Sequence, residues 1–184
     1  MARGYGLPGL KMDIELENHD GAEVEMQSIE AIASDENSLL EFVAPPKFRG
    51  RYLLMRGRNM WFISPGVSKP VPISPRQRLL GAVSNGDVAS TNFVGDYDAE
   101  IIEENRTCDA EVCYVLELTA AKPNVTYDRI HYWISKNRDL GIYAEFYTVS
   151  GRVFKTAKYE YDEQVLHQGQ KRTFVSRIKI NNLI

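Results

Sequence analysis

The chain has 184 residues, of which 43% are hydrophobic and 26% charged, with a formal net charge of −3 and a pI near 5.7. This is the composition of an ordinary soluble globular protein, and the length suits one hydrophobic core. The charge offers no basic patch for nucleic acid or for a membrane surface, and no apolar run is long enough to span a bilayer. We therefore expect a single domain over residues 1–184 that neither binds nucleic acid nor spans a membrane.

The first two segments with regular alternation predict a hairpin. Residues 10–18 alternate between apolar and charged side chains, which is typical of a half-buried strand. The apolar positions of this strand are Leu10, Met12, Ile14 and Leu16. After a turn at residues 18–21, the positions expected on the buried face are Ala22, Val24 and Met26. The alternation then changes phase near Ser28 and Ile29, which predicts a β-bulge.

Prolines and glycines mark the next strands. A strand over residues 38–43 should end before Pro45 and Pro46, and strands over residues 51–56 and 60–64 should form a hairpin around Gly57. Residues 69–73 contain two prolines, so they are expected at a sheet edge or in a loop.

A short insertion is expected at residues 74–96. Ser74 suits a helix N-cap and Pro75 a first helical residue, so a helix is predicted over residues 76–80, ending at Gly81. Residues 82–96 are small and polar, which indicates a loop that includes one helical turn.

Strands resume after this insertion, at residues 98–106, 112–120, 128–136, 140–149, 152–161 and 172–181. Roughly ten short strands with turns about every 8–12 residues indicate an antiparallel barrel or sandwich. A parallel sheet is not expected, because strands and helices do not alternate.

The two cysteines, Cys108 and Cys113, are separated by four residues. If their flanks form a hairpin with a four-residue loop, they lie opposite each other, at a Cα separation of about 4.5–5.5 Å that a disulfide can bridge. We therefore predict a disulfide and an oxidising compartment; the alternative is two independent small apolar residues. Two thiols without clustered histidines do not form a metal site.

Motifs for catalysis are missing from the sequence. The three histidines are scattered, the serines lack a nucleophile-elbow context and the glycines form no phosphate loop. We therefore expect no enzyme, no catalytic residue, no metal and no cofactor. A hydrolase that uses paired carboxylates stays open as an alternative, although Glu100, Glu103 and Glu104 have the pattern of a solvated strand face.

Aromatic side chains are the remaining signal. They gather on neighbouring predicted strands, and the strand at residues 128–136 carries large side chains on both faces. Such residues usually fill a core; the alternative is that part of the lining faces a ligand cavity. The apolar residues expected to line that cavity are Met12, Ile14, Leu16, Leu54, Trp61, Ile63, Leu116, Ile130, Tyr132, Ile134 and Phe146.

Seven segments, taken in order, resemble the outer-membrane lipoprotein-sorting (LolA-like) family. They are residues 42–45 (FVAP), 48–54 (FRGRYLL), 59–65 (NMWFISP), 72–74 (PIS), 127–134 (YDRIHYWI), 144–147 (AEFY) and 151–155 (GRVFK). The resemblance implies a mainly β fold, a half-open antiparallel β-barrel with a short helical lid insertion, and it supplies no catalytic residues.

The resemblance also implies a function and a location. It implies a periplasmic carrier or chaperone that binds a lipid or an acylated lipoprotein, with an inner- or outer-membrane transport partner. The alternative is an envelope sensor or accessory protein that binds a segment of a protein partner. No apolar stretch follows residues 1–4, so the signal peptide that this location requires is expected to be missing from this sequence. Family members usually begin with an amphipathic helix, so the short residues 1–8 and the abrupt end after Asn181 indicate either a trimmed chain or a reduced member.

Overall fold

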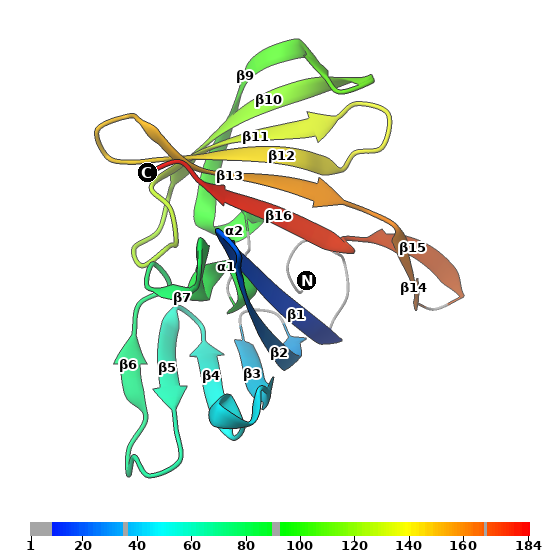
Figure 1. Ribbon diagram of the computed structural model, residues 1–184. Coiled ribbons are helices and arrows are strands. Elements are labelled where there is room, and N and C mark those ends of the chain that lie inside the picture. Colours follow the sequence, from blue (N-terminus) through cyan, green and yellow to red (C-terminus); the bar gives the residue numbers. More distant parts are fainter. Residues whose placement is uncertain (1–8, 35–36, 90–92, 168) are drawn as a thin grey trace. The chain divides into compact units, whose positions relative to one another are not determined.

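The computed structural model describes residues 9–34, 37–89, 93–167 and 169–184 (Figure 1). Contacts between Cα atoms divide the chain into two compact units. The first comprises Met1–Phe93 and Asn124–Thr126, and the second comprises Val94–Pro123 and Tyr127–Ile184. The short segment before the first strand, residues 1–8, lies outside the described residues.

The first unit contains a six-stranded sheet in which each strand pairs with the next along the chain. Its strands are β1 (Leu10–Asp20), β2 (Glu23–Ser34), β3 (Asn37–Ala44), β4 (Arg51–Arg56), β5 (Asn59–Ile63) and β6 (Val71–Ile73). β3 ends directly before Pro45, as predicted, and a 3-10 helix, Pro46–Phe48, follows it. The predicted hairpin around Gly57 is confirmed, and the proline-containing β6 is an edge strand, because proline has no N–H for a further partner.

The two faces of β2 differ from the prediction. Ala22, Val24 and Met26 are exposed, so their expected burial is wrong. The buried positions of this strand are Gln27, Ile29, Ala31 and Ala33. The predicted bulge near Ser28 and Ile29 is confirmed, but it lies in the pairing of β2 with β3, while β1 and β2 pair without interruption. β2 therefore keeps one phase along its whole length.

The insertion at residues 74–96 contains β7 (Arg78–Leu80), β8 (Val83–Ser84), α1 (Asn85–Ala89) and α2 (Phe93–Asp96). The helix predicted over residues 76–80 is wrong, because these residues form a turn and then β7. The capping contacts are nevertheless present, since Ser74 Oγ accepts the Arg76 N–H at 3.2 Å and the Ser74 N–H donates to Gln77 Oε1 at 2.7 Å. This turn caps α1 instead. The Gly86 N–H donates to the Pro75 carbonyl and the Asn85 N–H donates to the Gln77 carbonyl, each at 2.9 Å.

The second unit contains another six-stranded sheet, in the order β16-β13-β12-β11-β10-β9. Its strands are β9 (Tyr97–Cys108), β10 (Glu111–Ala120), β11 (Arg129–Ser135), β12 (Gly141–Tyr147), β13 (Val153–Glu160) and β16 (Arg177–Asn182). Between β13 and β16 the chain forms a separate hairpin, β14 (Glu163–His167) and β15 (Gln170–Phe174), visible in Figure 1. The single strand predicted over residues 172–181 is therefore two strands, interrupted where Ser176 donates its N–H to the Glu160 carbonyl at 2.8 Å.

Every strand pair in the described residues is antiparallel, and neither six-stranded sheet closes on itself. The prediction of a mainly β, open antiparallel fold with a short helical insertion is therefore confirmed. The sixteen strands of the described chain exceed the roughly ten expected from alternation. β6, β7 and β8 have only two or three residues each and carry no periodic signal, and β14, β15 and β16 stand where one C-terminal strand was expected.

Candidate ligand-binding faces

One face of the first sheet carries a continuous apolar cluster, here called the first-unit cluster. The sheet contributes Leu16, Ile29, Ala31, Leu40, Phe42, Leu53, Met55 and Met60. The insertion contributes Leu80, Val88 and Ala89. This face is largely apolar because every second residue of β1 to β5 points to it and most of the buried positions hold aliphatic or aromatic side chains, with Gln27 and Ser38 as polar exceptions. The insertion thus covers an apolar sheet face, as a lid would.

A buried polar contact fastens the insertion to this sheet. Ser38, at 3% exposure in β3, donates its hydroxyl to the Ala89 carbonyl at 2.9 Å. The N-terminus of α1 is capped by its own sequence, because Asp87 Oδ2 accepts the backbone N–H and the hydroxyl of Ser84, each at 2.8 Å. α1 has only five residues, so its position depends on packing rather than on helix length.

The six predicted lining residues of the first unit lie on opposite faces of one sheet. Leu16 belongs to the first-unit cluster, and Met12 and Ile14 pack against it. Leu54, Trp61 and Ile63 lie on the other face, since their positions alternate with the cluster residues of β4 and β5. One apolar surface therefore brings together only the three residues of β1.

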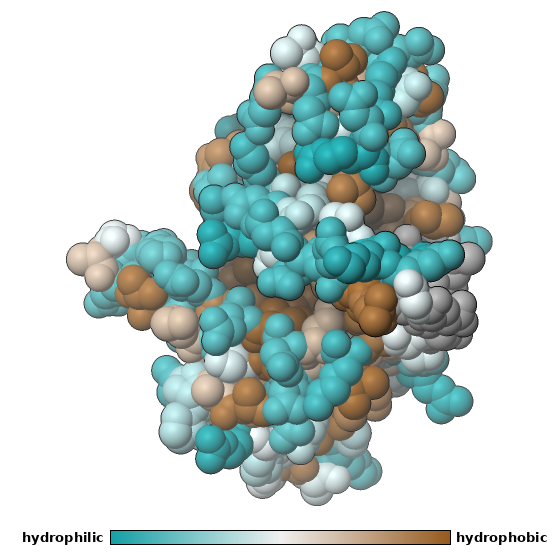
Figure 2. Space-filling view, turned by 90° about the vertical axis from the view of Figure 1, so that its right-hand side faces the viewer, coloured by the Kyte–Doolittle hydropathy of each residue, from teal (hydrophilic) through white to brown (hydrophobic). Residues whose placement is uncertain are grey.

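The opposite face of the first sheet mixes apolar and charged side chains. Leu54 pairs across the strands with Leu39 and Trp61, and Ile32 pairs with Leu39. Ile32 is 57% exposed and Leu39 40%, but acidic side chains such as Glu30 alternate with them. On the side of the molecule drawn in Figure 2, brown hydrophobic side chains are interspersed with teal hydrophilic ones. Scattered exposed apolar residues of this kind are ordinary in globular proteins.

The five predicted lining residues of the second unit share one sheet face. The register pairs Leu116 with Tyr132, Leu118 with Ile130, and Ile130 with Phe146, and Ile134 is two residues beyond Tyr132. Ile130 and Phe146 are buried at 0% and 3% exposure. Each unit therefore has its own apolar sheet face.

Lys155 was not anticipated from the sequence, because one charged residue in a strand suggests a solvent-facing position. It is 5% exposed and pairs in register with Phe146. Its ammonium group donates to the Tyr127 hydroxyl at 2.7 Å and lies 5.0 Å from the centre of that ring. These contacts account for its burial, since a buried cation requires polar and aromatic partners.

A chain of polar contacts crosses the other face of the second sheet. His131 Nε2 lies 3.0 Å from Glu117, its Nδ1 lies 2.9 Å from the Tyr147 hydroxyl, and that hydroxyl donates to Glu145 at 2.8 Å. Burial, followed by the hydrogen bond to Glu145, raises the pKa of Tyr147 well above its ordinary value. The hydroxyl therefore remains a donor at neutral pH, and the contacts join β10, β11 and β12. Among the described residues, no group of three or more histidines, cysteines and carboxylates is placed to hold a metal ion.

The disulfide prediction is confirmed. Cys108 and Cys113 are bonded, with a Cα separation of 6.2 Å. Their expected placement directly opposite each other is wrong, because Cys108 pairs with Glu111 and Cys113 pairs with Arg106. The hairpin loop has two residues rather than four, so the bond crosses the two strands diagonally.

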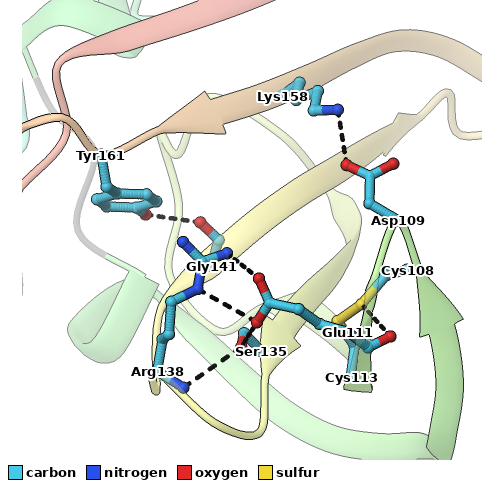
Figure 3. A network of polar contacts seen from close by, with 9 residues as sticks. All are labelled: Cys108, Asp109, Glu111, Cys113, Ser135, Arg138, Gly141, Lys158 and Tyr161. Carbon is cyan, nitrogen blue, oxygen red and sulfur yellow. Dashed lines mark hydrogen bonds and ion pairs between the residues drawn. A yellow bond between two sulfur atoms is a disulfide. The ribbon is translucent and has the colours of Figure 1, made fainter.

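Next to this disulfide lies a polar network that the sequence did not reveal (Figure 3). Glu111 accepts hydrogen bonds from the Ser135 hydroxyl and from Arg138, whose Nη2 lies 2.5 Å from Glu111 Oε1. The hydrogen bonds from Ser135 and then Arg138 hold the pKa of the Glu111 carboxyl below its ordinary value. Asp109, in the hairpin turn, accepts a bond from Lys158 at 2.7 Å. These contacts fasten the hairpin end to two other strands.

Comparison with solved structures places this fold among known relatives. A LolA superfamily protein from Nitrosomonas europaea is 34% identical to this chain and superposes on it with a TM-score of 0.81. The match covers 96% of this chain and 78% of the Nitrosomonas protein. A DUF1329 family protein from Desulfovibrio piger is 22% identical, with 95% and 79% covered and a TM-score of 0.80. A putative outer membrane lipoprotein-sorting protein domain from Vibrio parahaemolyticus is 17% identical, with 95% and 77% covered and a TM-score of 0.76.

Two further comparisons complete this result. A family model whose description is an uncharacterised protein matches residues 34–184, and no curated protein matches at a significant level. None of the helices in the described part of the chain is long and apolar enough to cross a membrane. The 34% identity over nearly the whole chain, together with the shared fold, shows that this chain belongs to the LolA superfamily.

Proposed function

We propose that this protein is a carrier or chaperone that holds the acyl chain of a lipid or lipoprotein against the first-unit cluster. The observation that carries the proposal is an apolar sheet face of the first unit on which the short insertion packs. The protein also shares its fold with a LolA superfamily protein and a lipoprotein-sorting domain, and this shared fold supports the proposal.

The energetics favour exchange of the insertion for a ligand. Burial contributes about 0.8 kcal/mol per methylene, so a sixteen-carbon chain gains roughly 12 kcal/mol on leaving water. Lifting the insertion would expose Leu80 and Val88, at a cost of about 3–6 kcal/mol for both side chains. An acyl chain that takes their place can therefore offset the cost of opening.

The disulfide supports a periplasmic location for this protein. A bond between Cys108 and Cys113 persists in an oxidising compartment, so we place the protein in the periplasm, where it would meet a membrane transport partner. Intact-mass measurement on protein from a periplasmic fraction should show a gain of one hydrogen per sulfur on reduction. A fully reduced pair in that fraction would contradict this location.

Direct binding tests the function. Delipidated protein should bind a fluorescent fatty acid and a lipopeptide saturably, with a dissociation constant in the micromolar range or below. Absence of saturable binding to both would reject the carrier function. Capture of one membrane-anchored protein without lipid would favour a sensor or accessory role instead, and turnover of the ligand would contradict our proposal that the protein is not an enzyme.

Two matched substitutions locate the site. Ile14 and Leu54 are both half-buried, but only Ile14 packs against the first-unit cluster. Ile14→Asp should weaken fatty-acid binding at least about tenfold, because it places a charge on the apolar face. Leu54→Asp should leave binding unchanged. Circular dichroism of both variants controls for folding, and equal losses of binding would move the site away from this face.

A further inference from the structure

Gln27 is a polar side chain in an otherwise apolar row. It is 5% exposed, and the other buried residues of its strand face are Ile29, Ala31 and Ala33. Its partner on β1 is Leu16, a member of the first-unit cluster. On its other side the pairing with β3 begins only at Ser28, so no residue of β3 pairs with Gln27. The amide therefore lies on the cluster face, where β2 extends beyond β3.

The side-chain oxygen of Gln27 lacks a hydrogen-bond donor. Within the described chain, Oε1 is the one buried side-chain nitrogen or oxygen atom without a partner. Roughly 90% or more of buried polar groups are hydrogen-bonded in folded proteins, because an unpaired group loses its bonds to water and gains none. Other buried polar side chains of this chain follow that rule, as Ser38 and Lys155 do. An apolar residue at position 27 would fit the row without this cost.

We propose that Gln27 Oε1 is the polar anchor of the ligand site, and that the ligand is an acyl chain whose head group carries an N–H or O–H donor. This inference rests on the proposed carrier function and specifies the class of lipid. An amide or a hydroxyl next to the acyl chain can donate to Oε1. An ester or an ionised carboxylate offers only acceptors and leaves the oxygen unpaired.

A competition experiment with four ligands that share one acyl chain distinguishes ligands with a hydrogen-bond donor from those without one. The four ligands are the N-methyl amide, the monoacylglycerol, the methyl ester and the free fatty acid, each displacing a fluorescent fatty acid from delipidated protein. The amide and the monoacylglycerol should each bind the wild-type protein roughly tenfold more tightly than the ester, a difference of about 1.4 kcal/mol. In Gln27→Met, which keeps an unbranched side chain, these ratios should fall to about one.

The thermal stability of the ligand-free protein is a second measurement, and in it Gln27→Met should bring a gain rather than a loss. Gln27→Met should raise its melting temperature by about 2–4 °C, because an unpaired buried oxygen is removed. Ser28→Ala is the matched control: Ser28 is half-buried on the other face of the same strand, and its variant should keep the wild-type ligand ratios.

The possible outcomes distinguish this inference from the function beneath it. A preference for the amide alone or for the monoacylglycerol alone supports the anchor and identifies its donor as N–H or O–H. Equal binding of donor and ester ligands, tighter binding of the fatty acid, or a preference that survives Gln27→Met overturns the anchor but leaves the carrier function standing. Failure of all four ligands to bind rejects both.

Discussion

At the scale of single residues, Gly141 is constrained by its neighbours. A Cβ atom at this position would lie 1.6 Å from the hydroxyl oxygen of Tyr132 and 1.9 Å from its Cζ. The Tyr161 hydroxyl also donates to the Gly141 carbonyl at 2.6 Å, as Figure 3 shows. The first residue of β12 is therefore enclosed by two tyrosines, and a side chain there requires the Tyr132 ring to move.

Substituting this glycine should destabilise the protein. Gly141→Ala is expected to lower the free energy of unfolding by about 1–3 kcal/mol, the usual cost of overpacking, measured by urea denaturation. Gly9→Ala is the matched control, since a Cβ there comes no closer than 3.6 Å to the Ala33 carbonyl, and it should stay within about 0.5 kcal/mol of wild type. Equal unfolding free energies for the two variants would contradict this account of Gly141.

At the scale of elements, the strands with long alternation were predictable and the short elements were not. β1 is visible because Leu10, Met12, Ile14 and Leu16 repeat every second residue. The helix predicted after Ser74 does not form, because its capping contacts are local, whereas Leu80 at the end of β7 is buried in the first-unit cluster among residues distant in sequence. A local signal of about 1 kcal/mol is outweighed by tertiary packing.

The candidate site was predictable only in part. The alternation of β1 correctly brings Met12, Ile14 and Leu16 to one face, but no local signal says that Leu54 and Trp61 face the other way. That assignment depends on the register between strands, which hydrophobicity does not encode when both faces carry apolar residues. The burial of Gln27 could have been predicted, because it belongs to the same alternating positions of β2 as Ile29, Ala31 and Ala33.

The cap of α1 supports a prediction in which stability and binding change in opposite directions. Asp87→Ala removes the acceptor of two hydrogen bonds from Ser84 and should cost about 1–2 kcal/mol of stability. If a ligand must displace α1, the same change lowers the cost of opening and should strengthen fatty-acid binding. Asp13→Ala, on the exposed face of β1, is the control and should alter neither property. Weaker or unchanged ligand binding by Asp87→Ala would show that α1 does not cover the site.

At the scale of the whole molecule, ion pairs connect stability to pH. Glu111 and Glu160 each have a lowered carboxyl pKa, caused first by the hydrogen bond from Ser135 and by the hydrogen bond from Lys179, respectively. Below the ordinary carboxyl range, the unfolded chain binds protons that the folded protein still excludes. The stabilisation from these two groups is therefore complete above that range, and it disappears as the pH falls through the folded pKa values.

Replacing Glu111 should make the protein less sensitive to acid. At neutral pH, Glu111→Gln should melt at a lower temperature than wild type, because the bonds from Ser135 and Arg138 lose their charged acceptor. As the pH falls below the carboxyl range, wild type should lose more stability than the variant, so that the two melting temperatures converge. Glu104→Gln, an exposed position on β9, should run parallel to wild type at every pH. A gap between wild type and Glu111→Gln that stays constant with pH would mean that Glu111 acts by shape and not by charge, because only the charged form gains from these bonds.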